Sequence, residues 1–339
     1  MKKIIYLITF TILLGSLESC GESEELLADT NSALTEPKES WVHIPMSVDS
    51  IKQFGTYNAL GFGYDVTGEY ANASYIRTKI IDAQEFHLAN PTSYVEIPIS
   101  SGEYKETYSA NALIFSQKLS QNTNTTQNLA VFGKTIPFAN AVQNNKYDPT
   151  YIYGTYNSTI KTKRYLFEVS INQLISFLTD EFTSDIKQKT PSQIVDKYGT
   201  HVMTNIYVGG SYDLIFQAKT KNPDKERAAY LGVKDYSSSN NSNLIGEASL
   251  NYSKRIYYRT RGGAKAQNIA GMYNLDNITP SFDIAVWQST LSNNNSVLVD
   301  FGQNGLVPIY DFVQDQAKKS ELKMYIDQYL EANKVILGS

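Results

Sequence analysis

Two long stretches of the chain alternate between apolar and polar residues. In Val202–Lys219 the even-numbered positions are almost all apolar, and the odd-numbered positions are mostly polar. Leu244–Arg261 shows the same period of two, with arginines among its odd-numbered positions. Because successive side chains of a β-strand point to opposite faces of the sheet, this period predicts two strands. Both are about three times as long as a usual strand of about 5–6 residues, which argues against an ordinary β-sandwich.

Two weaker strand patterns come earlier in the chain, at Glu106–Lys118 and Tyr151–Val169. The two strands of each pair are separated by an insert without a strand pattern, which is 119–150 in the first pair and 220–243 in the second. The sequence therefore predicts four long strands in two pairs, with an insert between the members of each pair.

Helical patterns occupy the region between the two strand pairs and the last part of the chain. From Ile171 to Ile186 apolar residues recur three and four positions apart, which predicts one amphipathic helix. Apolar residues at similar spacing predict a last helix at about 312–333. Predicted helices thus separate the two strand pairs and follow the last strand.

The segment TPSQIVDKYG (190–199) carries start and stop signals of a short helix. Thr190 is the expected N-cap, with Pro191 at the first helical position and Gln193 completing a capping box. Gly199 is the expected C-cap. We therefore expect the chain to leave a helix at Gly199 and to enter a strand almost at once.

Two glycine pairs stand in or beside the long strands. Gly209 and Gly210 lie inside one strand, and Gly262 and Gly263 follow the other. Glycine within a strand marks a bend or a close approach of another backbone. We interpret the two pairs as the place where the sheet bends sharply; the alternative is that they are incidental loop glycines.

The N-terminal residues resemble a lipoprotein targeting segment. Lys2 and Lys3 precede an apolar run that is too short to span a bilayer as a helix. The run ends at the sole cysteine of the chain, Cys20, which is predicted to be the lipidated first residue of the mature protein after removal of 1–19. Residues 20–40 are acidic and predict a flexible tether. We expect export and a lipid anchor in the bacterial outer membrane, with the protein surface-exposed or released; the alternative is a plain signal peptide with a free cysteine.

Charge and candidate chemistry narrow the possible functions. The net charge is -4, and the absence of a basic block argues against a nucleic-acid partner. His201 has no nucleophile motif near it, and His43 and His87 lack metal-ligand spacing. The acidic pair Asp180 and Glu181 stands in a charged, solvated segment. We therefore expect no catalytic, metal or cofactor site and interpret His201 as a structural, hydrogen-bonded residue.

The segment around His201 resembles the signature core of the membrane attack complex/perforin (MACPF) family, here Tyr198, Gly199, Thr200 and His201. Further similar segments follow in the family's order. These are GFGYDVTGEYA (61–71), the glycine pair at 209–210, TRGG (260–263), WQSTL (287–291) and LVPIYDFV (306–313). Together they cover roughly 41–333.

The resemblance implies a fold and a division of the chain. The expected fold is of the α+β class, with a bent, four-stranded antiparallel sheet flanked by two helical clusters. The expected MACPF domain covers 41–315, and 316–339 would form a C-terminal helix packed on it. In lytic members each helical cluster unwinds into an amphipathic β-hairpin. The corresponding candidate membrane-inserting segments are Lys118 to Thr150 and Lys219 to Ala248.

The two candidate segments differ in how well they suit a bilayer. They contain 33 and 30 residues, and a transmembrane hairpin needs roughly 20–25 residues. The first has an apolar stretch at 129–142, although Pro137 interrupts it. The second has five charges within Asp224–Lys234. Length therefore permits insertion of both, and composition favours the first.

The resemblance also implies a function. We expect a pore-forming or membrane-interacting protein, an antibacterial or host-directed effector that oligomerises and inserts hairpins. Its partners would be the lipid bilayer or a surface receptor of a target cell, and further copies of itself. The alternative is a non-lytic surface adhesin or binding lipoprotein that uses the same scaffold, and a secreted hydrolase is a third class.

Overall fold

The computed structural model describes residues 43–45, 54–121, 132, 146–237, 250–275 and 284–339. Contacts divide the chain into two units, 1–40 and 41–339. The predicted signal peptide, Cys20 and the tether lie outside the described residues. So do most of the first insert, the last residues of the second insert and the start of the Leu244–Arg261 stretch.

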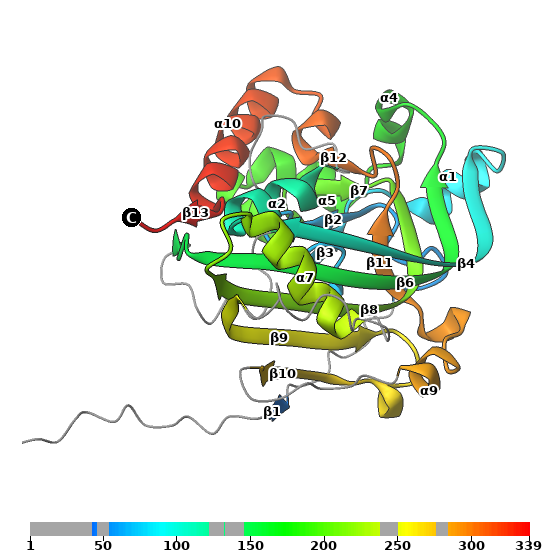
Figure 1. Cartoon of the computed structure of the whole chain (residues 1–339). Helices are drawn as coiled ribbons and strands as arrows, with labels where there is room; N and C mark the ends of the chain where they lie inside the picture. The colour runs from blue at the N-terminus through cyan, green and yellow to red at the C-terminus, as the bar shows by residue number, and fades with distance from the viewer. Residues whose placement is uncertain (1–42, 46–53, 122–131, 133–145, 238–249, 276–283) are drawn as a thin grey trace, which may run out of the picture. The chain divides into compact units, whose positions relative to one another are not determined.

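A seven-stranded antiparallel sheet is the main element of the second unit (Figure 1). Its strands lie in the order β1-β10-β9-β8-β6-β4, and β11 pairs with the remaining part of β8. Four of its strands are long and form an antiparallel core, as the expected fold requires. The strands are β1 (His43–Pro45), β4 (Tyr94–Ser109), β6 (Tyr151–Phe167), β8 (Asn205–Thr220), β9 (Asn251–Arg261), β10 (Ala270–Asn274) and β11 (Val297–Phe301).

Two smaller sheets and several helices complete the unit. The smaller sheets are β12-β7-β2-β3, and β13 paired in parallel with β5. Their strands are β2 (Phe62–Tyr64), β3 (Ile76–Lys79), β5 (Lys146–Tyr147), β7 (His201–Met203), β12 (Leu306–Pro308) and β13 (Ile336–Leu337). The α-helices are α1 (Ala83–Ala89), α2 (Ala112–Ser120), α4 (Ile171–Leu174), α5 (Asp180–Gln188), α6 (Pro191–Tyr198), α7 (Lys225–Ser237), α9 (Ala285–Gln288) and α10 (Gln316–Asn333). Short 3-10 turns are η1 (Ala73–Tyr75), η2 (Ile175–Phe177), η3 (Lys265–Gln267), η4 (Asn293–Asn295) and η5 (Ile309–Phe312).

The first predicted strand, Glu106–Lys118, is wrong. The strand is β4, which ends at Ser109, and the chain then turns into helix α2. Asn111 causes the change, because its side chain accepts a hydrogen bond from the backbone N–H of Ile114 and caps the helix. β4 lies at an edge of the sheet and is exposed at many positions, so it lacks the apolar alternation that a half-buried strand shows.

Two other elements are divided where one was predicted. The long stretch from Val202 passes between two sheets at Thr204, so that β7 belongs to the small sheet and β8 to the main one. The helix predicted from Ile171 to Ile186 is broken at Leu178, which turns extended and forms a bridge with Ile81. The strand prediction at Tyr151–Val169 and the capping box of α6 are confirmed.

The glycine pair inside β8 marks an exchange of neighbouring strands. From Ser211 onward β8 pairs with β9, beginning opposite Arg261. From Gly209 backward the same edge of β8 pairs with β11, where Val297 lies opposite Gly209. On the other edge, β6 has its register shift beside this point. The strands curve at this end of the sheet (Figure 1).

Both glycine pairs lie where other groups approach closely. A Cβ on Gly209 would collide with the carbonyl oxygen of Ile160. Gly262 and Gly263 have φ near +75°, and a Cβ on Gly262 would lie 2.6 Å from the carbonyl oxygen of Gly209. The indole N–H of Trp287 donates to the carbonyl oxygen of Gly262 at 2.9 Å. The two pairs therefore meet at one point, and the role of this point as a bend stays an interpretation.

Candidate functional site

The four signature residues join helix α6 to strand β7. Tyr198 is fully buried and its hydroxyl donates to Asp185 at 3.0 Å. Gly199 has φ of +76°, and a Cβ there would lie 2.6 Å from the backbone of Tyr64. The backbone N–H of Thr200 donates to the carbonyl oxygen of Tyr64 at 2.9 Å. These contacts hold the end of α6 against β2.

His201 lies in a buried position on β7, between strands β2 and β12. Its backbone pairs with Tyr64 of β2 on one side and with Pro308 of β12 on the other. The Nδ1 atom lies 2.9 Å from the hydroxyl of Thr200, and only 2% of the residue is exposed. Burial lowers the pKa of His201 from 6.5 to about 4, against a smaller opposing effect of Asp65. The imidazole is therefore neutral at pH 7.

This burial predicts a pH dependence of stability that His201→Gln removes. The unfolded chain takes up the imidazole proton at about pH 6.5, whereas the folded protein does so at about pH 4. Stability should therefore fall by on the order of 3 kcal/mol as the pH drops from 6.5 to 4, and level off below pH 4.

Urea unfolding at steps between pH 7 and pH 4 measures the effect. His201→Gln should be less stable than the parent at pH 7, yet its stability should change less over this range. If the free energy of unfolding changed equally with pH in the two proteins, His201 would not be the titrating group.

Helix α7 lies on the face of the sheet formed by the even-numbered residues of β6 and β8. Ala228, Ala229 and Val233 of the helix are fully buried against this face. The helix approaches β6 so closely that a Cβ on Gly154 would lie 2.5 Å from Val233. Gly232 packs in the same way on the ring of Phe216. Glycine at these two positions thus lets the helix lie directly on the strands.

Helix α2 lies on the opposite face, formed by the odd-numbered residues. Phe115 packs in a cluster with Tyr153 and Ile215 of that face. A cavity of about 110 Å³ remains between α2 and the sheet, and Phe115 and Leu119 line it beside charged and polar side chains.

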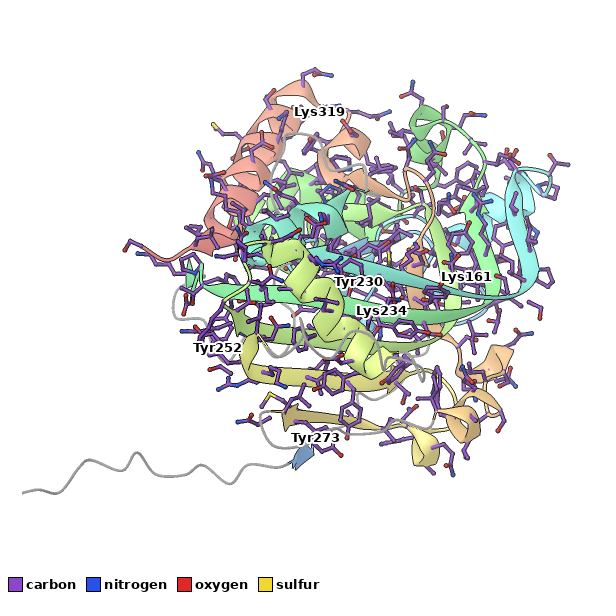
Figure 2. All side chains as sticks on the ribbon, viewed as in Figure 1. Lys161, Tyr230, Lys234, Tyr252, Tyr273 and Lys319 are labelled. Carbon is purple, nitrogen blue, oxygen red and sulfur yellow. The ribbon has the colours of Figure 1, made fainter. Side chains whose placement is uncertain are left out.

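An ion pair from α7 and a hydrogen bond from α2 connect the two helices to the edge strand β4. Lys234 of α7 donates to both carboxylate oxygens of Glu106, at 2.6 and 2.8 Å, and the two side chains are largely buried. Lys118 of α2 donates to the carbonyl oxygen of Tyr108 at 2.7 Å and to Glu226 of α7 at 2.6 Å. The ring of Tyr230 lies edge-on to Tyr108 at 5.1 Å. Figure 2 shows Tyr230 and Lys234 on α7 above the strands.

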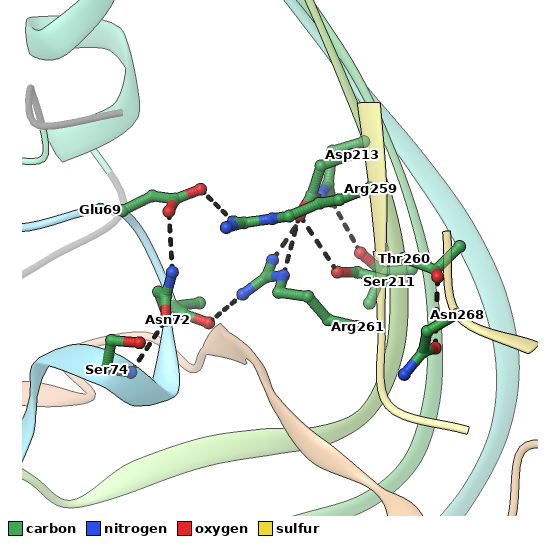
Figure 3. Close-up of polar contacts among 12 residues, drawn as sticks. Glu69, Asn72, Ser74, Ser211, Asp213, Arg259, Thr260, Arg261 and Asn268 are labelled. Carbon is green, nitrogen blue, oxygen red and sulfur yellow. Dashed lines mark hydrogen bonds and ion pairs between the residues drawn. The ribbon is translucent and has the colours of Figure 1, made fainter. Parts of the chain in front are cut away.

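A buried charge network lies on the odd-numbered face (Figure 3). Asp213 of β8 accepts from the Nε atoms of Arg259 at 3.2 Å and Arg261 at 2.8 Å. Arg259 also pairs with Glu69, which in turn accepts from the side-chain amide of Asn72 at 2.7 Å. The two arginines and two carboxylates balance in charge, and their pairing offsets the cost of burial. The network ties strands β8 and β9 to the loop at 65–72.

A second network lies farther along the same face. Asp300 of β11 accepts from Lys105 at 3.0 Å, from Lys161 at 2.9 Å and from the hydroxyl of Tyr70 at 2.5 Å. Burial alone would raise the pKa of Asp300, but the charge of Lys105 and the hydrogen bond from Tyr70 bring it below its ordinary value. Lys161 also pairs with Glu103. This network ties β4 and β6 to β11.

The profile of the MAC/Perforin domain matches residues 55–336, which is most of the chain. The chain belongs to the MAC/Perforin family. The match includes the signature residues, both glycine pairs and the helices α2 and α7.

Two solved bacterial structures share the MAC/Perforin fold with this chain. One is a protein with a MAC/Perforin domain from Bacteroides thetaiotaomicron, with a TM-score of 0.68 at 15% sequence identity over 87% of this chain and 64% of that chain. The other is GNIP1Aa from Chromobacterium piscinae, with a TM-score of 0.63 at 16% identity over 83% of this chain and 57% of that chain. This chain therefore spans less than two thirds of either relative. No curated protein sequence matches it.

The candidate membrane-inserting segments are described only in part. Of the first candidate segment, Lys118 to Thr150, the structure describes the end of α2, Phe132 and the residues from Lys146 onward. Of Lys219 to Ala248 it describes the end of β8 and all of α7. Helix α2 begins at Ala112, six residues before the first candidate segment begins at Lys118. Within the described ranges, none of the helices is both long and apolar enough to cross a membrane.

Sequence reasoning missed the two charge networks and the ion pairs of α7. The arginines of β9 alternate on one face, which could have predicted a charged face opposite Asp213. The partner Glu69 could not be found in this way, because it lies far away in the sequence. Among the described side chains, no group of three or more His, Cys, Asp or Glu residues is placed to hold a metal ion.

The ion pair between Glu106 and Lys234 should stabilise the packing of helix α7 on the sheet. Lys234→Met removes a charged hydrogen bond to a largely buried carboxylate, which is worth roughly 1.5–3 kcal/mol. Amide hydrogens of 225–237 should therefore exchange faster, while those of α10 stay unchanged. Lys323→Met is the matched control, because Lys323 pairs with Asp327 on the surface of α10. Equal exchange of α7 in both variants would contradict a role of this pair in holding the helix.

Proposed function

We propose that the protein forms pores in membranes of neighbouring bacteria or of a host, by oligomerisation followed by insertion of β-hairpins. The placement of α2 and α7 carries the proposal. α2 follows β4 directly, α7 follows β8 directly, and each rests on one face of the same four strands. A helix so placed can unwind and continue its strand, so that two hairpins extend from one end of the sheet.

The sequence of α2 suits a strand that crosses a membrane. In an extended chain Leu113, Phe115 and Leu119 would share one face, and Ser116 and Lys118 the other. Gln117 would interrupt the apolar face, and Ile114 would lie on the polar one. The alternation of membrane strands is therefore present in α2 with one exception on each face.

The sequence of α7 suits a membrane strand only in its middle. In an extended chain Ala229, Leu231 and Val233 would form an apolar face. Lys225 and Arg227 before this run and Asp235 after it would lie on that same face. A cation facing lipid costs about 2–4 kcal/mol at the midplane and about 0–1 kcal/mol near the interface. Insertion of α7 therefore requires these three charged residues to lie near the membrane surfaces.

The two edges of the long-stranded core differ. Within the described residues β4 pairs only with β6, so its outer edge offers backbone groups to a second copy. The outer edge of β9 is covered by the five residues of β10, and β1 covers β10 in turn. Assembly through both edges would require β10 to leave β9. The short β10 offers few hydrogen bonds against that exchange.

We also propose where the protein acts and on what. The mature chain is exported and attached through a lipid on Cys20 to the outer membrane, and it meets the bilayer or a surface receptor of a target cell as a homo-oligomer, without nucleic acid and without catalysis. The N-terminal pattern of 1–19 followed by Cys20 supports this location. Mass spectrometry of the mature N-terminus tests it, because an unmodified Cys20 in the membrane fraction would contradict the anchor.

Release of a trapped dye from liposomes tests pore formation. Purified residues 21–339 should release the dye from vesicles of bacterial or host lipid composition and should form rings visible by electron microscopy. Intact vesicles over a wide range of compositions, with no rings, would contradict the proposal.

The alternative function is a non-lytic adhesin that keeps the scaffold and does not insert. The cations of α7 and its close packing on Gly154 favour this alternative. An adhesin would bind target cells without releasing dye, and its binding would not depend on movement of α7. A hydrolase would lose turnover in His201→Ala while keeping its melting temperature, whereas the burial of His201 predicts a loss of stability.

A further inference from the structure

Residues 334–338 connect the end of the chain to the base of the first insert. Ile336 and Leu337 form β13, which pairs in parallel with Lys146 and Tyr147 of β5. The backbone N–H of Gly338 donates to the carbonyl oxygen of Tyr147 at 2.6 Å. We call residues 334–338 the strap.

The strap also packs against helix α2. Val335 is only 4% exposed and belongs to the same apolar cluster as Phe115 of α2 and Tyr147 of β5. Leu337 is partly buried against this cluster. The strap thus contacts the two segments that border the first insert.

The other end of the strap is fixed to a different part of the protein. It follows helix α10, whose residues Leu322, Ile326 and Leu330 are buried in the core that also contains α6. The hydroxyl of Tyr329 donates to Asp65 at 3.1 Å. Helix α10 therefore holds the strap to a core that does not contain β5 and that α2 contacts through Leu119.

The register of β4 and β6 shows which residues would pair if both strands were extended into the first insert. Ser109 of β4 lies opposite Tyr153 of β6. In an antiparallel pair each step forward on one strand matches one step back on the other. Six further steps would place Phe115 opposite Tyr147, and a seventh would place Ser116 opposite Lys146. An extended first hairpin thus requires Tyr147 and Phe115 as neighbours in one ladder.

We propose that the strap is an autoinhibitory contact that competes with extension of the β4–β6 ladder. The backbone of β13 occupies one edge of β5, so no other strand can pair along that edge while β13 stays there. Val335 packs in the same apolar cluster as Phe115 in its helical position. Release of the strap frees both members of the new pair at once. This inference rests on the proposed insertion of the first hairpin.

Removal of strap contacts tests the proposal in solution, without any membrane. In Val335→Ser, amides of 112–121 and 146–150 should exchange about tenfold faster, the change that ~1.4 kcal/mol of lost contact produces. Amides of α7 should not change. Met324→Ser is the matched control, because Met324 is exposed on α10. Unchanged exchange at both segments in Val335→Ser would overturn the proposal.

A cross-link strengthens the contact that Val335→Ser weakens, so this second test does not depend on a destabilised variant. Ile336→Cys and Lys146→Cys place two exposed, directly paired residues at a separation that suits a disulfide. Cys20→Ser leaves these as the sole thiols. The oxidised protein should release liposome dye at least about tenfold more slowly than the reduced protein, the effect of ~1.4 kcal/mol on a barrier.

The two readouts separate failure of the strap from failure of the proposed function. If the parent releases dye and neither variant changes its rate, the strap does not oppose insertion and the proposal is overturned. If Val335→Ser accelerates exchange while no form of the protein releases dye, the strap holds α2 and β5 as inferred and pore formation is the part that fails.

Discussion

Asp213→Ala is expected to lower the free energy of unfolding by about 3–5 kcal/mol, because it leaves buried charges without their partner. Asp213 accepts from both Arg259 and Arg261, and all three side chains are at most about a tenth exposed. Burial alone would raise the pKa of Asp213, but the charges of Arg261 and Arg259 lower it below its ordinary value. In the variant Arg259 would keep Glu69 as its partner, whereas Arg261 would lose the carboxylate to which it donates.

Urea unfolding at pH 7 measures this effect. Asp148→Ala is the matched control, because Asp148 pairs with Lys219 at the surface and its side chain is 43% exposed. That variant should lose no more than about 1 kcal/mol. A loss of less than about 1 kcal/mol in Asp213→Ala would mean that water replaces the carboxylate and that the network does not fasten β8 and β9 to the loop at 65–72.

A disulfide between α7 and the sheet is expected to abolish dye release while it stays oxidised. Gly154→Cys and Val233→Cys suit such a bond, because a Cβ on Gly154 lies 2.5 Å from a methyl carbon of Val233. The two Cβ atoms are therefore within about 4 Å of each other, as a disulfide requires. The oxidised bond prevents α7 from leaving β6, so the second hairpin cannot form.

The same protein with the bond reduced is the control for this experiment. Dye release should return after reduction in a Cys20→Ser background, and binding to the vesicles should be equal in both states. Equal dye release in both states would show that α7 stays on the sheet during action. That result would mean that only the first hairpin inserts, or that the protein is the non-lytic adhesin.

The sequence predicts those parts of the fold that local patterns specify. The alternation in Tyr151–Val169 and the cap residues around Thr190 predict β6 and α6 correctly. The edge strand β4 was misplaced, because an exposed strand has no apolar period to detect. The break at Leu178 depends on its bridge with the distant Ile81. A tertiary contact of this kind leaves no local signal.

The candidate site shows the same division between local and distant information. The signature residues could be found because they are contiguous in the chain. The strap could not be found, because the pairing of Ile336 with Lys146 joins segments that are far apart and individually very short. The network around Asp213 likewise needs Glu69 and Arg259 to be brought together by folding. Sequence patterns predict strands and helices, and the contacts that hold them in place follow only from topology.

The exchange of partners along β8 has a consequence for how the protein folds. One edge of this strand is completed by β9 and, beyond Gly209, by β11, which comes much later in the chain. Closing such long loops costs entropy before the contacts repay it, so folding should be slow. Until β11 arrives, part of β8 presents unpaired backbone groups, and exposed strand edges promote aggregation of folding intermediates. A chain whose proposed action is to join copies edge to edge is therefore at greatest risk of joining them too early, during its own folding.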